Sequence, residues 1–226
     1  MKQLKFPIKT NLMITGLIMC LFFICLCFIV QLPQANIQET QWLLQGHHYY
    51  AHYDAALSSI SIFLAYVGGA PISSALVLLL SALAFVKKRG DLSFFAITAF
   101  VGAIAIGWLF KEIVARPRPQ VWEQIAPQFG YSFPSNHSMY AMVLAGILLV
   151  YGYQTAWRHV AIMLGGLWCF VMGLSRMYLG AHFPTDVVGG FSLGLVWLCL
   201  VTWLFIRFNI FQHRASNTAG NHEVKL

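Results

Sequence analysis

The feature that most constrains this chain is a series of apolar stretches long enough to cross a lipid bilayer. A helix of about 20 apolar residues spans the hydrocarbon core. Six stretches fall in this class: Leu12–Val30, Ala55–Val86, Leu92–Phe110, His137–Trp157, Val160–Tyr178 and Val187–Ile206. The second is too long for one straight crossing, and the sequence Gly-Gly-Ala-Pro at positions 68–71 predicts a kink or break within it. We therefore expect an all-α, polytopic membrane protein with six transmembrane helices.

Composition excludes other classes of protein. Hydrophobic residues make up 59% of the 226 residues and charged residues only 9%, against about 25% charged in soluble domains. Such a chain cannot cover a soluble surface and is not disordered. The net charge of +7 could indicate a nucleic-acid partner, but the apolar content argues against one. The five cysteines all lie in apolar stretches, where we expect small buried side chains rather than disulfides.

A polar and aromatic segment, residues 31–54, separates the first two apolar stretches. It contains Trp42, Tyr49, Tyr50 and Tyr53, which favours a short interfacial helix at the level of the lipid headgroups. His48 and His52 are four residues apart and could instead bind a metal ion. The aromatic residues around them favour the interfacial interpretation.

The basic residues predict the orientation in the membrane. With six crossings, most of the 14 Lys and Arg fall on the side of both termini, which we assign to the cytoplasm. The first apolar stretch resembles a signal peptide but is long for one, so we expect a retained helix. We expect one domain over residues 1–211 and a polar cytoplasmic tail over residues 212–226. On the outer side, the basic residues form two groups: Lys111, Arg116 and Arg118, and Arg176.

Three motifs lie at the outer ends of the expected helices. They are Lys111-x6-Arg118-Pro119, Pro134-Ser135-Asn136-His137, and Ser175-Arg176-x5-His182-x3-Asp186. In order and spacing they resemble the signature of the type 2 phosphatidic acid phosphatase (PAP2) superfamily, which includes membrane lipid phosphatases and is related to the vanadium haloperoxidases. The resemblance covers residues 111–186 and implies a PAP2-type helical bundle.

Two details of these motifs need interpretation. Arg116-Pro117 and Arg118-Pro119 are adjacent, and the spacing of the family selects Arg118. Asn136 stands where the family usually has glycine. Because Asn tolerates positive φ better than other non-glycine residues, we expect the turn to persist, with a side chain added beside the phosphate site.

The residue types suit the binding of a phosphate group at a membrane surface. Lys111, Arg118 and Arg176 offer fixed positive charge and hydrogen-bond donors. Ser135 stands at an expected helix start, where an N-cap and free backbone N–H groups favour an anion. Asp186 follows His182 by four residues and could accept the Nδ1 hydrogen, which leaves Nε2 as a nucleophile.

The resemblance implies the same division of roles. His182 would attack phosphorus and form a phosphohistidine, Asp186 would orient it, and His137 would act as general acid and then base. The implied phosphate-binding residues are Lys111, Arg118, Ser135, Asn136 and Arg176. No metal or other cofactor is required, because cationic side chains supply the positive charge.

We therefore expect a lipid phosphatase of the cytoplasmic membrane with its site on the outer face. The resemblance offers undecaprenyl diphosphate, phosphatidylglycerophosphate, phosphatidate and lipid A as substrates, and an outward site favours the first. Phosphate transfer to another lipid is an alternative. A transporter of anions or lipids is another alternative. The charged residues of a transporter site should lie at mid-membrane, however, and here they lie at helix ends. A structural subunit would leave the His182–Asp186 spacing unexplained, and the basic residues could also be headgroup anchors.

Overall fold

The computed structural model describes residues 8–50, 55–121, 130–153 and 155–211. These residues form helices and contain no strand, which confirms the all-α class. The expected tail, residues 212–226, lies outside them. The helices are α1 (Ile8–Ile29), α2 (Pro33–Tyr50), α3 (Ala55–Val67), α4 (Ala70–Val86), α5 (Gly90–Val114), α6 (Asn136–Gly152), α7 (Arg158–Tyr178) and α8 (Pro184–Arg207).

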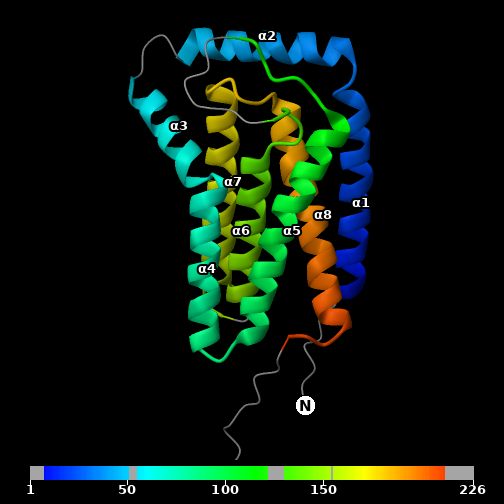
Figure 1. The fold of residues 1–226 in the computed structure, drawn as a ribbon, viewed down its shortest axis with the longest axis vertical. Coiled ribbons are helices and arrows are strands. Elements are labelled where there is room, and N and C mark those ends of the chain that lie inside the picture. The colour runs from blue at the N-terminus through cyan, green and yellow to red at the C-terminus, as the bar shows by residue number, and fades with distance from the viewer. Residues whose placement is uncertain (1–7, 51–54, 122–129, 154, 212–226) are drawn as a thin grey trace, which may run out of the picture.

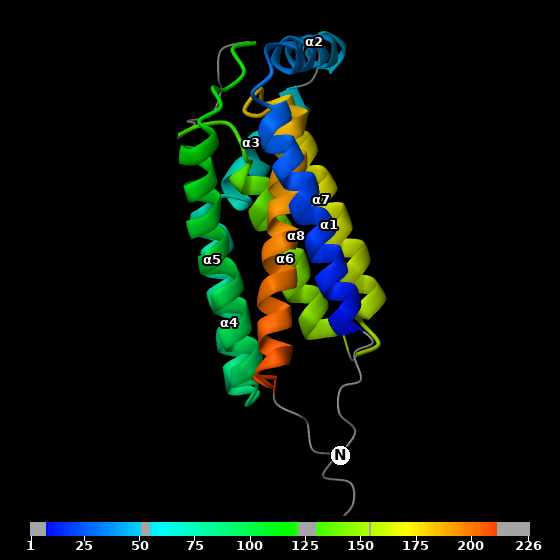
Figure 2. The same cartoon turned by 90° about the vertical axis from the view of Figure 1, so that its right-hand side faces the viewer.

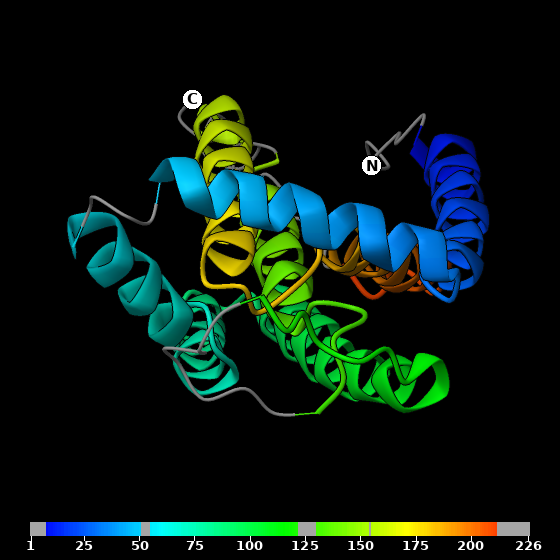
Figure 3. The same cartoon turned by 90° about the horizontal axis from the view of Figure 1, so that it is seen from above.

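Most of the helices run along one axis and form a bundle, while α2 lies across one end of it (Figures 1 and 2). Helix α6 packs between α7 and α8, α1 covers α8, and α5 packs on α4 and α6. Seen from above, α2 crosses over the ends of α7 and α8 (Figure 3). We call this the capped end: α2 with the last turns of α5 and α7 and the first turns of α6 and α8. The far end carries the α4–α5 connection and the last turn of α8.

Length and hydropathy identify most of the expected crossings. In the described chain, α1, α5, α7 and α8 are each long and apolar enough to span a membrane, and α3 with α4 would form a bent fifth span. The sixth expected crossing is α6, an apolar helix of 17 residues that ends at Gly152, earlier than predicted. Six crossings therefore stay a prediction. Large apolar side chains on the outside, such as Phe28 and Met163, suit contact with lipid.

The predicted break in the second apolar stretch is confirmed. Helix α3 ends at Val67 and α4 begins at Ala70, and the two axes differ by 56°. Gly69 is the N-cap of α4, and Pro71 follows in its first turn, where the missing N–H of proline costs nothing. The predicted interfacial helix corresponds to α2. The alternative metal site at His48 and His52 depends on side chains outside the described residues.

Close packing at glycines brings α6 against α7 and α8. A Cβ at Gly165 would lie 2.8 Å from Cβ of Ala145, and one at Gly190 would lie 2.3 Å from the carbonyl oxygen of Ser135. At Gly166, by contrast, a Cβ would meet no atom of the described residues within 4 Å. The five cysteines are free, as expected. Only Cys199 is buried, however: Cys25 of α1 is exposed, and the other three are partly buried.

Candidate active site

The three motifs meet at the capped end of the bundle. Lys111 lies in the last turn of α5, and Arg176 in the last turn of α7. His137 lies in the first turn of α6, and Asp186 in the first turn of α8. Lys111, Arg176 and His182 are close enough to His137 to act on it electrostatically. Residues from four helices and two connections therefore share one site.

Backbone hydrogen bonds join the connections that carry the motifs. Ala115 adopts the left-handed conformation and ends α5 four residues after Lys111. The N–H of Ser132 donates to the carbonyl of Arg116 at 2.8 Å, and the N–H of Ser135 donates to the carbonyl of Asp186 at 3.0 Å. The second bond ties the start of α6 to the start of α8. Motifs far apart in the sequence are thereby held together.

The side chains of His182 and Asp186 face each other and are both buried. Their nearest atoms, Nδ1 and Oδ2, are 3.6 Å apart, slightly longer than a hydrogen bond. In the described chain Nδ1 of His182 has no hydrogen-bond partner. The structure thus brings the predicted pair together, with Asp186 as the neighbour of Nδ1.

Burial keeps the imidazole of His182 neutral. Removal from water lowers its pKa to about 3, although the adjacent Asp186 carboxylate acts in the opposite direction. The positive charges of Arg118 and Lys111 lower the pKa further. A neutral imidazole has a lone pair on one ring nitrogen, which is the form that a nucleophile requires.

The three predicted phosphate-binding cations are held mainly by backbone oxygens. Lys111 donates to the carbonyl of Ser132 at 3.4 Å and to that of Tyr131. Arg176 donates to the carbonyl of Ser61 at 3.2 Å. In the described chain neither Lys111 nor Arg176 forms a direct ion pair with a carboxylate, so their positive charge is available to an anion.

Arg118 joins this group from the connection after α5. Its Nε donates to the carbonyl of Gly130 at 2.9 Å and its Nη1 to that of Ala181 at 2.8 Å. Ala181 precedes His182, so this arginine lies next to the candidate nucleophile. Burial lowers the pKa of Arg118, an effect that Asp186 partly offsets, but arginine stays protonated in proteins.

The neighbouring Arg116, which the motif spacing did not select, has a different environment. Its Nη1 donates to Oδ1 of Asp186 at 2.6 Å and its Nη2 lies 3.3 Å from Oε1 of Glu39. Arg116 and Glu39 are both buried. Sequence reasoning missed this group. Two features of the sequence could have indicated this group: the repeated Arg-Pro, and an isolated acidic residue, since Glu39 is the only one before Asp54.

The start of α6 partly matches the prediction. Ser135 is the N-cap, and its Oγ accepts a hydrogen bond from the N–H of Ser138 at 3.4 Å. Asn136 does not adopt a positive φ, because it is already the first residue of the helix. Among the described residues its buried Oδ1 has no hydrogen-bond partner, and it faces Gly107 of α5, where a Cβ would lie 2.6 Å away. The turn therefore persists without a positive φ, and the side-chain oxygen of Asn136 faces α5. The place of Asn136 among the phosphate-binding residues stays a prediction.

Helix α3 covers one side of the site. Its Ala65 carbonyl lies 3.0 Å from Nε2 of His137, and its Ser61 carbonyl accepts from Arg176. Because a carbonyl only accepts, Nε2 of His137 carries a hydrogen in this arrangement. A substrate phosphate that approaches His137 and Arg176 would replace these two carbonyl contacts.

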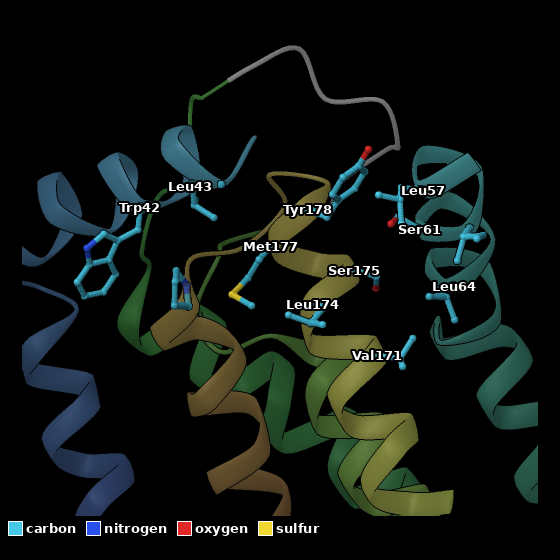
Figure 4. Close-up of a pocket in the computed structure, with 13 residues that line it drawn as sticks. Trp42, Leu43, Leu57, Ser61, Leu64, Val171, Leu174, Ser175, Met177 and Tyr178 are labelled. Carbon is cyan, nitrogen blue, oxygen red and sulfur yellow. The ribbon is translucent and has the colours of Figure 1, made fainter. Parts of the chain in front are cut away.

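An apolar cavity of about 680 Å³ adjoins the polar residues. It lies between α2, α3 and α7, and side chains of α3 and α7 face each other across it (Figure 4). Ser175, the neighbour of Arg176, and Pro184, which follows His182 by two residues, are both on its wall. The rest of the wall is mainly apolar and includes Trp42, Leu43, Leu57, Ile60, Leu64, Val171 and Leu174.

Comparison with known proteins identifies phosphatases among the relatives. The chain is 35% identical over 98 residues to phosphatidylglycerophosphatase B of Bacillus subtilis, a match that covers 41% of this chain and 48% of that protein. It is 28% identical to the undecaprenyl-diphosphatase BcrC of the same species over 74% of this chain and 82% of the relative. These names support a phosphoric ester hydrolase.

The fold has a solved counterpart. The crystal structure of a transmembrane PAP2-type phosphatidylglycerolphosphate phosphatase from Bacillus subtilis superposes with a TM-score of 0.77 and 24% identity, over 85% of this chain and 96% of that one. Residues 92–210, which include every motif described above, match the PAP2 superfamily. The chain belongs to this superfamily, as its motifs indicated.

Proposed function

We propose that this protein hydrolyses the phosphate or diphosphate group of a membrane lipid through a phosphohistidine at His182. The observation that carries the proposal is a buried, neutral histidine beside a carboxylate and next to cations, at one end of a membrane bundle. Nucleophile, orienting group and charge stabilisation are the parts that phosphoryl transfer requires.

In the first step, Nε2 of His182 forms a bond to phosphorus while the bond to the leaving oxygen breaks. His137 gives its proton to that oxygen. Water then attacks the phosphohistidine and loses a proton to His137, and the N–P bond breaks to release phosphate. Asp186 keeps the Nδ1 side of His182 fixed, so that Nε2 faces the phosphorus.

The negative charge on the transferring group would be stabilised by three cations and by the start of α6. Lys111, Arg118 and Arg176 converge on the site, and the first N–H groups of α6, at Asn136 and His137, favour an anion. No step requires a metal ion, because the cationic side chains supply the positive charge that stabilises the transferring group.

The substrate we propose is undecaprenyl diphosphate. The apolar cavity beside Ser175 suits a lipid tail, and a relative that covers 74% of this chain is named undecaprenyl-diphosphatase. Phosphatidylglycerophosphate is the second candidate, because the relative with the higher identity is named for that lipid. Phosphatidate and lipid A complete the set to be tested.

The proposed location is the cytoplasmic membrane, with the capped end on the outer face. Lys87, Lys88, Arg158 and Arg207 all lie at the far end. By the positive-inside rule, this basic group supports a cytoplasmic far end. The lipid headgroup would then be hydrolysed on the outer side, where the polyprenyl carrier is released.

The decisive experiment measures phosphate release by detergent-purified protein in the presence of EDTA. The four lipids are tested in parallel with the wild-type protein and the His182→Ala variant. We expect release that EDTA does not reduce and that the substitution lowers by about 1,000-fold or more, because the nucleophile is removed. A folded wild-type protein that releases no phosphate from any of the four lipids contradicts the proposal. Release below one equivalent per lipid consumed would indicate phosphate transfer to another lipid.

A further inference from the structure

A buried arginine links the interfacial helix to the carboxylate beside His182. The Arg116 guanidinium donates to Oδ1 of Asp186 at 2.6 Å through Nη1. Through Nε and Nη2 it also donates to Oδ1 of Asn36, at 3.0 and 2.7 Å. The ring of Phe183 lies 4.1 Å from its central carbon. Every side of this guanidinium therefore contacts protein.

Glu39 completes the same network from α2. Its Oε1 is 3.3 Å from Nη2 of Arg116, and its Oε2 accepts from the backbone N–H of Thr185 at 3.0 Å. The hydroxyl of Thr185 donates to the same carboxylate at 2.8 Å. Glu39 thus caps the N-terminus of α8 from another helix, where the dipole favours a negative charge.

The network fixes both oxygens of Asp186. Arg116 binds Oδ1, while Oδ2 accepts from the N–H of Phe183 at 2.8 Å and from the hydroxyl of Ser132. Oδ2 is also the atom that faces Nδ1 of His182. Rotation of the carboxylate would break a charge-assisted hydrogen bond to a fully buried arginine, which is costly.

We propose that Arg116 and Glu39 are positioning residues for the reaction. They anchor Asp186 through α2 and thereby hold the His182 ring in line for attack. This inference rests on the proposed phosphatase function. The guanidinium of Arg116 is already bound by Asp186, Asn36 and Glu39, so it does not bind the phosphate itself. The two neighbouring arginines therefore have different roles. Arg118 binds the carbonyl before His182, whereas Arg116 binds the carboxylate oxygen of Asp186 that does not face His182.

The test separates positioning from phosphate binding. We would measure kcat and KM for Arg116→Gln and Glu39→Gln with the lipid that the wild-type protein hydrolyses best. A misplacement of about 1 Å can cost about 100-fold, so we expect kcat to fall about 10- to 100-fold. KM should stay within about threefold, because the groups that contact substrate are unchanged. The double variant should lose little more than Arg116→Gln, since the two residues act as one unit.

A matched control comes from the far end of the bundle. Arg89 forms an ion pair with Asp91 at 2.8 Å, and Arg89→Gln removes an arginine–aspartate interaction away from the site. We expect its kcat to equal that of the wild-type protein. If Arg116→Gln does not fold, as judged by size-exclusion chromatography, Glu39→Gln and Arg116→Lys carry the test, because both preserve side-chain size.

The outcomes distinguish the two proposals. Folded Arg116 and Glu39 variants with kcat within about twofold of the wild-type value overturn the positioning role, and so does a loss confined to KM. A wild-type protein without phosphatase activity contradicts the proposed function and the positioning role together.

Discussion

The two ends of the bundle each contain an arginine–aspartate pair with almost the same shortest distance. Arg116 and Asp186 approach to 2.6 Å at the capped end, and Arg89 and Asp91 approach to 2.8 Å at the far end. The first pair is buried and joins segments 70 residues apart. In the second pair the residues are two apart, and the Arg89 side chain is 34% exposed.

The difference lies in what each aspartate touches. Asp91 stands in the first turn of α5, where a carboxylate favours the helix start, and its arginine is the N-cap residue. Asp186 stands beside His182 and is held from α2 by Arg116 and Glu39. A short ion pair therefore indicates nothing about catalysis by itself; the neighbouring groups decide its role.

The sharpest test of this comparison is substitution of the two aspartates. Asp186→Asn should lower kcat by about 1,000-fold or more, because an amide no longer holds His182 in the required tautomer. Asp91→Asn should leave kcat of the folded protein unchanged and lower only its thermal stability. Phosphate release and thermal unfolding of both variants would be measured side by side. Equal losses of kcat would contradict the distinction between the two ends.

Two glycines extend the comparison to helix packing. Gly190→Ala would place a Cβ 2.3 Å from the Ser135 carbonyl, so the start of α6 must shift and we expect activity to fall at least about 10-fold. Gly102→Ala would instead displace the Trp197 ring, which also donates to the Ala99 carbonyl at 2.7 Å. This second variant should lose stability, by about 1–3 kcal/mol, while the folded fraction keeps its activity.

Measurement of activity per folded molecule and of the melting temperature separates these two effects. A Gly190→Ala variant with wild-type activity would show that the α6–α8 contact does not position the site.

A smaller effect is expected where Asn136 meets α5. Gly107→Ala would bring a Cβ within 2.6 Å of Oδ1 of Asn136 and should cost about 1–3 kcal/mol of stability. Adding Asn136→Gly should restore most of that loss, because the clashing side chain is gone. The two residues touch, so a double-mutant cycle of unfolding free energies measures their coupling. An additive result would contradict the contact.

The smallest effect is a dependence of stability on pH. Burial lowers the pKa of His182 to about 3, against an ordinary value of about 6.5. Between these values the unfolded chain binds a proton that the folded chain does not, so stability falls as pH drops below about 6.5. At pH 5.5 the loss is about 1 kcal/mol. Asp186 and Arg118, which act on His182, stay charged at this pH.

Thermal unfolding from pH 7.5 to 5.5 would test this expectation, with His182→Asn as the control. The variant should show a weaker dependence on pH. At the far end, Arg89 adds no dependence of stability on pH in this range. The hydrogen bond to Asp91 raises the pKa of this arginine, so it stays charged. An identical pH dependence in wild type and variant would contradict a neutral buried His182.

Several features could be predicted because they depend on local order in the chain. A long apolar stretch must form a helix in a bilayer, since its backbone groups have no other partners. Ser135 caps the helix that follows, and the glycine-proline sequence ends α3, for reasons confined to a few residues. The family motifs also followed from residue types and spacing alone. The sequence by itself therefore determined the membrane class, most of the crossings and the family.

Only the tertiary structure assigned partners to the side chains. The sequence offered Arg116 and Arg118 as near equivalents, yet one lies against Asp186 and the other against the carbonyl before His182. It offered no reason to pair Glu39 with Arg116. The direction of Asn136 depended on Gly107 in another helix. These choices are set by contacts between segments many residues apart, where packing and burial, rather than local propensity, decide which charges meet.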